Sequence, residues 1–150
     1  MLEPSEIGCA YGLEQLKKLE TFTKRRDEVT QRHLDFFSKY SNFFEIPKMN
    51  ANVNSSWFAF PLIVKEKAPF TRTDLQIFLE ERNIQTRVIF TGNIIRQPAF
   101  KGIEKKVSKD GYPVADRVMA RGFLLGNHHG LTEEMIEHVH KSVDIFIKNY

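Results

Sequence analysis

The sequence has one cysteine, no long apolar run and no glycine-rich phosphate loop. Because Cys9 is the only cysteine among 150 residues, no intramolecular disulfide can form, which is typical of a reducing compartment such as the cytoplasm. No run of about 18 apolar residues predicts a transmembrane helix, and the first residues do not resemble a signal peptide. Neither a P-loop nor a G-x-S-x-G motif occurs. These absences argue against a membrane protein, a disulfide scaffold, a P-loop nucleotidase and an α/β-hydrolase.

The excess of one sign of charge over the other is also small. The 22 lysines and arginines against 19 aspartates and glutamates leave a net charge of +3. The basic residues are scattered among acidic ones, whereas a nucleic-acid surface needs a denser basic cluster. No nucleic-acid partner is therefore predicted, although one or two cations suffice to bind an anionic small molecule. The thirteen phenylalanines supply enough apolar volume for a core.

The first half of the chain predicts a long helix and then a strand. Apolar residues recur near helical spacing over residues 5–44, which indicates a continuous spine or two helices broken near Thr30. A connector over residues 46–56 leads to an apolar, β-branched and aromatic strand over residues 57–64. Pro61 inside this strand favours a sheet edge or a bulge, because proline lacks a backbone N–H.

The second half alternates helices and strands. Thr71 and Asp74 form a capping-box pattern for a helix that ends near Asn83, and a strand is predicted over residues 86–90. After an irregular stretch (91–111), Pro113 begins a helix to residue 121, residues 123–125 form a strand, and Thr132 caps the last helix. This order predicts the α/β class: a small α/β sandwich over residues 46–150, preceded by a long spine helix over residues 1–45.

The loop over residues 90–100 carries the strongest local chemistry. Gly92 permits close backbone approach to a ligand. Asn93 and Gln97 both donate and accept hydrogen bonds, and the Arg96 fork matches phosphate or carboxylate. Arg87 lies on the preceding strand. The alternative is a turn that satisfies its own backbone, with Arg87 and Arg96 in structural ion pairs.

The histidines offer a second candidate. His128 and His129 stand between glycines after a strand, and one of them is a candidate for contact with substrate or with a neighbouring domain. No metal site is predicted, because adjacent side chains of an extended segment point to opposite sides and no further ligands are spaced for zinc. His33, His138 and His140 are predicted at the surface.

Four segments resemble the DegT/DnrJ/EryC1/StrS sugar aminotransferase family. Residues 1–19 look like the start of that family's long C-terminal-domain helix. Residues 84–100 are similar to its substrate-side loop, and residues 113–119 and 122–135 are similar to its closing segment. The Gly-Asn-x-x-Arg-Gln-Pro form in residues 92–98 is most similar to the branch of CDP-4-keto-6-deoxyglucose 3-dehydrases in lipopolysaccharide biosynthesis.

The resemblance implies the small C-terminal domain of a fold-type I enzyme that depends on pyridoxal phosphate (PLP) or pyridoxamine phosphate (PMP). It implies a homodimer acting on a nucleotide-linked keto-sugar, with either 3-dehydration or transamination as the reaction. The family's catalytic lysine or histidine would lie in a cofactor domain upstream of Met1, and no residue here matches it. The chain alone is therefore expected to bind no cofactor and to be inactive. Substrate-binding residues are predicted at Arg87, Gly92, Asn93, Arg96, Gln97, His128 and His129.

Two other classes remain open from the sequence: a free-standing ligand-binding module, and a dimerisation domain. Phe36, Phe37, Phe43 and Phe44 crowd the end of the spine, which predicts an exposed apolar face and self-association through the first helix.

Overall fold

The computed structural model describes residues 3, 5–53 and 55–150. Its helices and strands follow one another in the order α1 (Glu6–Leu16), α2 (Leu19–Ser38), β1 (Phe44–Glu45), β2 (Ala59–Val64), α3 (Arg72–Glu80), β3 (Thr86–Val88), the short 3₁₀ helices η1 (Ile94–Arg96) and η2 (Pro98–Phe100), α4 (Pro113–Arg121), β4 (Gly122–Gly126) and α5 (Glu133–Ile147). None of the described helices is long and apolar enough to span a bilayer.

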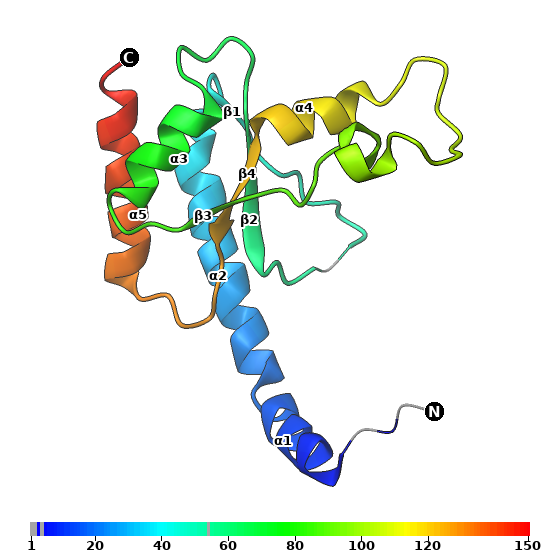
Figure 1. The fold of residues 1–150 in the computed structure, drawn as a ribbon. Helices are drawn as coiled ribbons and strands as arrows, with labels where there is room; N and C mark the ends of the chain where they lie inside the picture. Colours follow the sequence, from blue (N-terminus) through cyan, green and yellow to red (C-terminus); the bar gives the residue numbers. More distant parts are fainter. Residues whose placement is uncertain (1–2, 4, 54) are drawn as a thin grey trace.

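The strands form one antiparallel sheet in the order β1-β2-β4-β3. Helices α2, α3 and α5 pack on the sheet, and α1 projects away from it beyond the start of α2 (Figure 1). Helix α4 leads directly into β4, and the segment between β3 and α4 extends to the side of the domain. The α/β class with a preceding helical segment is confirmed.

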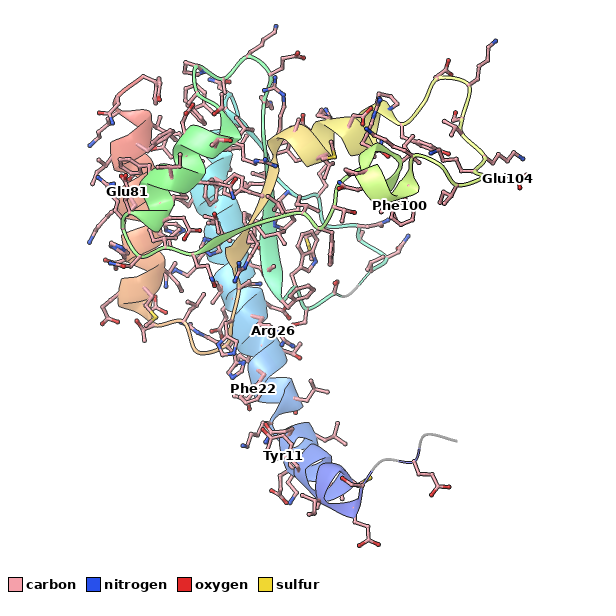
Figure 2. The ribbon with its side chains drawn as sticks, in the orientation of Figure 1. Tyr11, Phe22, Arg26, Glu81, Phe100 and Glu104 are labelled. Carbon is pink, nitrogen blue, oxygen red and sulfur yellow. The ribbon has the colours of Figure 1, made fainter. Side chains whose placement is uncertain are left out.

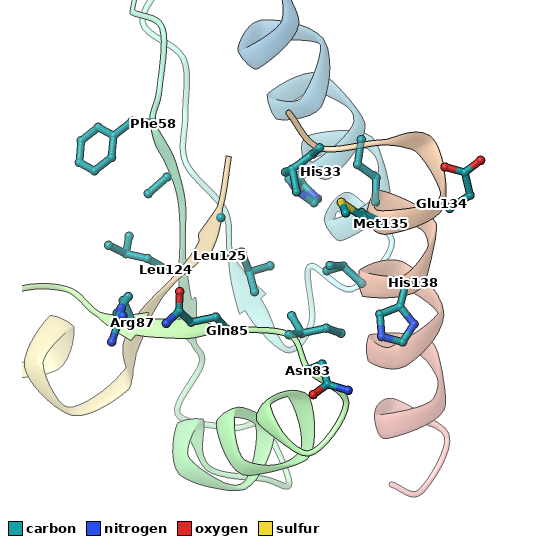
Figure 3. A pocket seen from close by; sticks show the side chains of 16 residues that line it. His33, Phe58, Asn83, Gln85, Arg87, Leu124, Leu125, Glu134, Met135 and His138 are labelled. Carbon is teal, nitrogen blue, oxygen red and sulfur yellow. The ribbon is translucent and has the colours of Figure 1, made fainter. Parts of the chain in front are cut away.

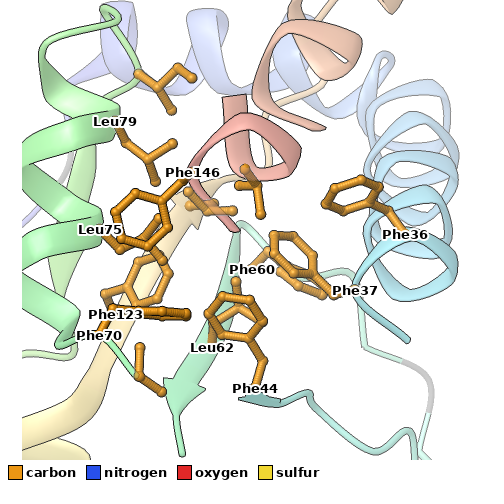
Figure 4. Packing of buried hydrophobic residues seen from close by; sticks show 14 residues of the cluster. Phe36, Phe37, Phe44, Phe60, Leu62, Phe70, Leu75, Leu79, Phe123 and Phe146 are labelled. Atoms are coloured by element: carbon orange, nitrogen blue, oxygen red, sulfur yellow. The ribbon is translucent and has the colours of Figure 1, made fainter. Parts of the chain in front are cut away.

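The core lies between the sheet and its three helices, and phenylalanines dominate it (Figure 4). Phe60, Leu62 and Val64 alternate with more exposed residues along β2 and are fully buried, as expected for a strand covered on one face. Phe37 of α2, Leu75 of α3 and further side chains of α5 close the other side.

The prediction of an exposed apolar face at the end of the spine is wrong. Phe36, Phe37 and Phe44 do not form an exposed face: they belong to the core, and Phe43 is half-buried against it. The reason is that α2 ends at Ser38 and the chain turns back into β1, which directs Phe44 inward. Within the spine, the exposed large apolar side chains lie instead at its other end, on α1 and at the start of α2.

The spine is two helices, as one of the two predictions stated, but the break is not near Thr30. It falls at Lys17 and Lys18, where the Lys18 N–H bonds Gln15 O at 3.0 Å. Thr30 lies inside α2, and its hydroxyl donates to Arg26 O at 2.9 Å. A threonine can satisfy its hydroxyl on the preceding turn without ending a helix.

The prediction for Pro61 holds only locally: the strand has no bulge, but at Pro61 its side away from β4 is unpaired. Strand β2 is internal in the sheet, and its register with β4 runs without interruption from Ala59 to Ile63. Proline is tolerated because β1 reaches only Ile63 and Val64. No strand on that side needs a donor from Pro61.

The local signals for helix ends are confirmed. Thr71 and Asp74 make a complete capping box. The hydroxyl of Thr132 accepts from Met135 N at 3.3 Å. Asn83 follows α3 in the left-handed region, with φ of 60°, as a residue that ends a helix often does.

Candidate functional site

The loop after β3 folds back onto α4. Phe90 has φ of 44° and Gly92 has φ of 64°, and η1 and η2 follow with Phe100 at the end of the second turn (Figure 2). A Cβ on Gly92 would lie 2.2 Å from Met119 Cβ. Gly92 therefore permits a close backbone approach, and the partner in this structure is α4.

Asp116, in the first turn of α4, joins two of the predicted residues. Arg96 Nε donates to Asp116 Oδ1 at 3.0 Å and Arg96 Nη2 to Asp116 Oδ2 at 2.9 Å. Asn93 Nδ2 donates to Asp116 Oδ1 at 2.8 Å, and Asn93 is 3% exposed. These hydrogen bonds, with that from Arg96 the larger, hold the pKa of Asp116 below its usual range. The carboxylate is therefore ionised at neutral pH.

Gln97 completes the cluster on α4. Its amide donates to Thr91 O at 2.9 Å and lies 3.9 Å from Met119 Sδ. Gly92, Asn93, Arg96 and Gln97 are thus brought together, and we call this set, with Asp116, the α4 loop cluster. Asp116 was not among the residues predicted from the sequence. An acidic residue in the first turn of a helix is common, so that position alone did not point to the loop.

Arg87 lies elsewhere, at the edge of a cavity of about 640 Å³ between the sheet and α5 (Figure 3). Most of the lining is apolar, and its polar side chains include His33 and His138 from two helices and Asn83 and Gln85 from the turn before β3. This composition is typical of a pocket for a small molecule or of a surface that a further domain covers. No hydrogen bond of the described residues connects Arg87 to the α4 loop cluster.

His33 is not at the surface. It is 1% exposed, lines the cavity, and its Nδ1 lies 3.0 Å from His140 Nε2. The helical spacing of α2 places it between Val29 and Phe36 on the buried face, so the prediction was wrong. His138 is exposed, with its Nε2 2.9 Å from Arg82 O, and His140 is half-buried.

His128 and His129 point to the same side, contrary to the prediction. Their ring centroids are 3.9 Å apart because the chain turns here instead of continuing as a strand. His128 Nδ1 accepts from Gly130 N at 3.0 Å, and His129 stacks on Phe22 of α2 with centroids 3.6 Å apart. Burial, and then the charges of His128 and Arg26, lower the pKa of His129.

Asn127 fixes this turn to the rest of the domain. It is 1% exposed, and its Nδ2 donates to Thr30 Oγ1 and to Trp57 O, both at 2.7 Å. A buried amide with two short donations has a single orientation. The turn is therefore joined to α2 and to the segment before β2, and its histidines lie apart from the α4 loop cluster.

No lysine of the described residues is among the side chains that line the cavity. No group of three or more histidine, cysteine, aspartate or glutamate residues in the described part of the chain could hold a metal ion. What the α4 loop cluster does offer is an exposed guanidinium with a fixed orientation.

The chain belongs to the DegT/DnrJ/EryC1/StrS aminotransferase family, whose model matches residues 4–144. It is 33% identical over 138 residues to lipopolysaccharide biosynthesis protein RfbH of Salmonella typhimurium, covering 92% of this chain and 31% of that protein. It is 34% identical over 146 residues to dTDP-4-dehydro-2,6-dideoxy-D-glucose 3-dehydratase of Saccharopolyspora spinosa, covering 97% and 31%. The chain thus spans about a third of the length of these relatives.

A transaminase and a solved dehydratase structure are also similar. The dTDP-4-amino-4,6-dideoxy-D-glucose transaminase of Escherichia coli is 27% identical over 137 residues, which are 91% of this chain and 36% of that protein. A GDP-4-keto-6-deoxymannose-3-dehydratase variant with bound GDP-perosamine superposes with a TM-score of 0.84 at 28% identity, covering 95% and 36%. The fold is therefore that of the C-terminal part of these enzymes.

Proposed function

We propose that this chain is the small domain of a PLP- or PMP-dependent nucleotide-sugar 3-dehydratase that removes a hydroxyl from a 4-keto-6-deoxyhexose. The observation that carries the proposal is the identity above 30%, over more than nine-tenths of this chain, to RfbH and to a 3-dehydratase. Under this proposal residues 1–45 connect to a cofactor domain and residues 46–150 form the small domain. The whole enzyme would be a cytoplasmic homodimer in deoxysugar or lipopolysaccharide biosynthesis.

The α4 loop cluster supplies the substrate contact in this proposal. The Arg96 side chain is 59% exposed, so its guanidinium can meet the diphosphate of a nucleotide sugar. Arg is well suited to this contact because its donors lie in one plane and remain charged. When bound, the cofactor would act as an electron sink next to the sugar carbonyl, while this chain binds and orients the sugar nucleotide.

The first test is Arg96→Ala in the full-length enzyme. Losing one hydrogen bond from a charged donor to substrate costs about 1.5–3 kcal/mol, or roughly ten- to a hundredfold in kcat/KM. Steady-state kinetics with the sugar nucleotide measure the loss, and the melting temperature checks the fold. An efficiency within about twofold of the wild type would show that the loop is structural.

Transamination is the second candidate, favoured by the likeness to the Escherichia coli transaminase. The two reactions differ in their products. Incubation with a nucleotide-linked 4-keto-6-deoxyhexose and glutamate gives a 3-deoxy ketosugar if the enzyme is a dehydratase, and a 4-amino sugar if it is a transaminase. Mass spectrometry of the product distinguishes the two.

The proposal also assigns cofactor retention to the rest of the enzyme. Since the proposal places the residues that hold the cofactor in the other domain, we expect this chain alone to keep no PLP or PMP after gel filtration and to turn over no sugar nucleotide. Absorbance of the protein peak measures retention. Stoichiometric retention by the isolated chain would contradict the proposed division of roles between domains.

A further inference from the structure

Asp116 controls which part of Arg96 faces solvent. The carboxylate occupies Nε and Nη2 of the guanidinium, at 3.0 and 2.9 Å. No hydrogen bond among the described residues uses Nη1, and the Arg96 side chain remains 59% exposed. A planar fork held along one edge cannot rotate, so its opposite corner keeps a constant direction.

The buried Asn93 helps to hold the Asp116 carboxylate in place. It is nearly fully buried, donates to Asp116 Oδ1 at 2.8 Å and accepts at its own Oδ1 from Ile95 N at 3.2 Å. The same carboxylate oxygen therefore receives Arg96 and Asn93. The start of α4 fixes Asp116, and Gly92 packs against the same helix at Met119.

We propose that Asp116 is a positioning residue of the substrate site: it holds Arg96 so that the guanidinium corner at Nη1 faces the diphosphate of the nucleotide sugar. The inference rests on the proposed function, which places substrate at Arg96. It adds a residue that does not itself contact the substrate and whose effect passes entirely through Arg96.

Two effects of Asp116 on an anionic ligand have opposite signs. As a negative charge beside Arg96, Asp116 repels a diphosphate, so Asp116→Asn alone would tighten binding if charge were all that mattered. As a positioning group it reduces the ordering cost of binding, so the same substitution would weaken binding. The sign of the change therefore decides between the two roles.

The experiment is a double-mutant cycle in the full-length enzyme, with the dissociation constant measured by calorimetry. The probe is whichever of dTDP, GDP and CDP binds the wild type most tightly. We expect Arg96→Gln to weaken binding by about tenfold or more and Asp116→Asn by about three- to tenfold. The double variant should be no weaker than Arg96→Gln alone. Asp116→Glu should recover part of the loss.

The control is Glu45→Gln, which removes the carboxylate partner of Arg117 in another exposed ion pair of the domain and should leave binding unchanged. Unchanged or tighter binding by Asp116→Asn, with Arg96→Gln still weaker, overturns the positioning role and leaves the proposed function standing. Additive losses in the double variant also overturn it. If Arg96→Gln itself binds as the wild type does, the proposed substrate contact fails and this inference fails with it.

Discussion

The buried His33 and the half-buried His140 form a hydrogen-bonded pair that is difficult to protonate. Burial, then His140 and then Arg32 lower the pKa of His33 to about 3. Burial and the positive charges of Arg32 and Lys39 outweigh Asp144 and Glu137 and lower the pKa of His140 to about 4. The hydrogen bond between them needs one nitrogen without a proton. The folded domain therefore resists protonation that the unfolded chain accepts near pH 6.5.

We expect the free energy of unfolding to fall as the pH drops below about 6.5. The unfolded state binds the proton first, so the contribution of His33 is present above pH 6.5 and is lost as the pH falls toward 3. Between pH 7 and pH 5 the loss from His33 is about 2 kcal/mol. Urea unfolding at the two pH values measures it.

A comparison of two variants isolates the pair. His33→Leu should be less stable at pH 7 but lose less stability on acidification. His138→Gln, at an exposed histidine of the same domain, should keep the full pH dependence. Equal pH dependence in the wild type and His33→Leu would contradict this account.

Gly92 is the glycine of the loop at which we expect no other residue to be tolerated. Gly92→Ala combines a φ of 64° with a Cβ only 2.6 Å from Met119 Cα and 2.2 Å from Met119 Cβ. Because backbone on α4 cannot yield as a side-chain tip does, we expect a destabilisation of about 2 kcal/mol or more. Thermal unfolding measures it. Gly102→Ala is the matched control, since nothing lies within 4 Å of its Cβ position, and a similar loss there would refute the steric argument.

For single residues, the sequence predicted which residues lie near one another better than it predicted their burial. Gly92, Asn93, Arg96 and Gln97 lie within six residues of one another, so their clustering follows from chain connectivity. Asp116 is twenty residues beyond Arg96, and only the packing of the loop on α4 brings it there. His33 was misplaced because it is polar, although its spacing from Val29 and Phe36 matches the buried face of α2.

Among the elements, α1 contributes nothing to the core. Helix α1 has no buried residue. We therefore expect that, at protein concentrations where both are monomeric, a chain beginning at Lys17 has the same free energy of unfolding as the whole chain, within about 0.5 kcal/mol. Urea unfolding of the two chains compares them, and hydrogen exchange should show little protection in α1. A large loss of stability in the shorter chain would mean that α1 packs on the domain.

The elements that were predicted well have local causes. The capping box of Thr71 and Asp74, the proline at the start of α4 and the threonine before α5 each act within a single turn. Strand β1 was not predicted because two residues, Phe44 and Glu45, carry no pattern. Their strand conformation comes from pairing with Val64 and Ile63, which lie about twenty residues away.

For the whole molecule, α1 presents an exposed apolar surface through which copies can associate. It projects from the domain, and Tyr11 lies far from the sheet (Figure 2). Apolar side chains at least half exposed line it and the start of α2: Ile7, Tyr11, Leu13, Leu16 and Leu19. A soluble protein rarely leaves such a group uncovered. We expect the chain to self-associate, as measured by sedimentation velocity across a range of concentrations.

Charged substitutions on α1 test this prediction, and a charged substitution on α5 is the control. Leu13→Lys combined with Leu16→Glu should shift the chain toward monomer. A charge at Ile145, an exposed apolar residue of α5, should leave association unchanged. A wild-type chain that stays monomeric at high concentration would contradict the prediction.

The order of the sheet sets when this domain can fold during its synthesis. Strand β4 pairs with β2 on one side and β3 on the other, and β2 and β3 do not meet. Phe60 finds its partner, Leu125, only sixty-five residues later, and such distant pairings form slowly. Until residues 122–126 leave the ribosome, β3 has no neighbour in the sheet and β2 lacks its partner β4. The sheet is therefore completed only after β4 has been synthesised, and until then its apolar strands are open to chaperones.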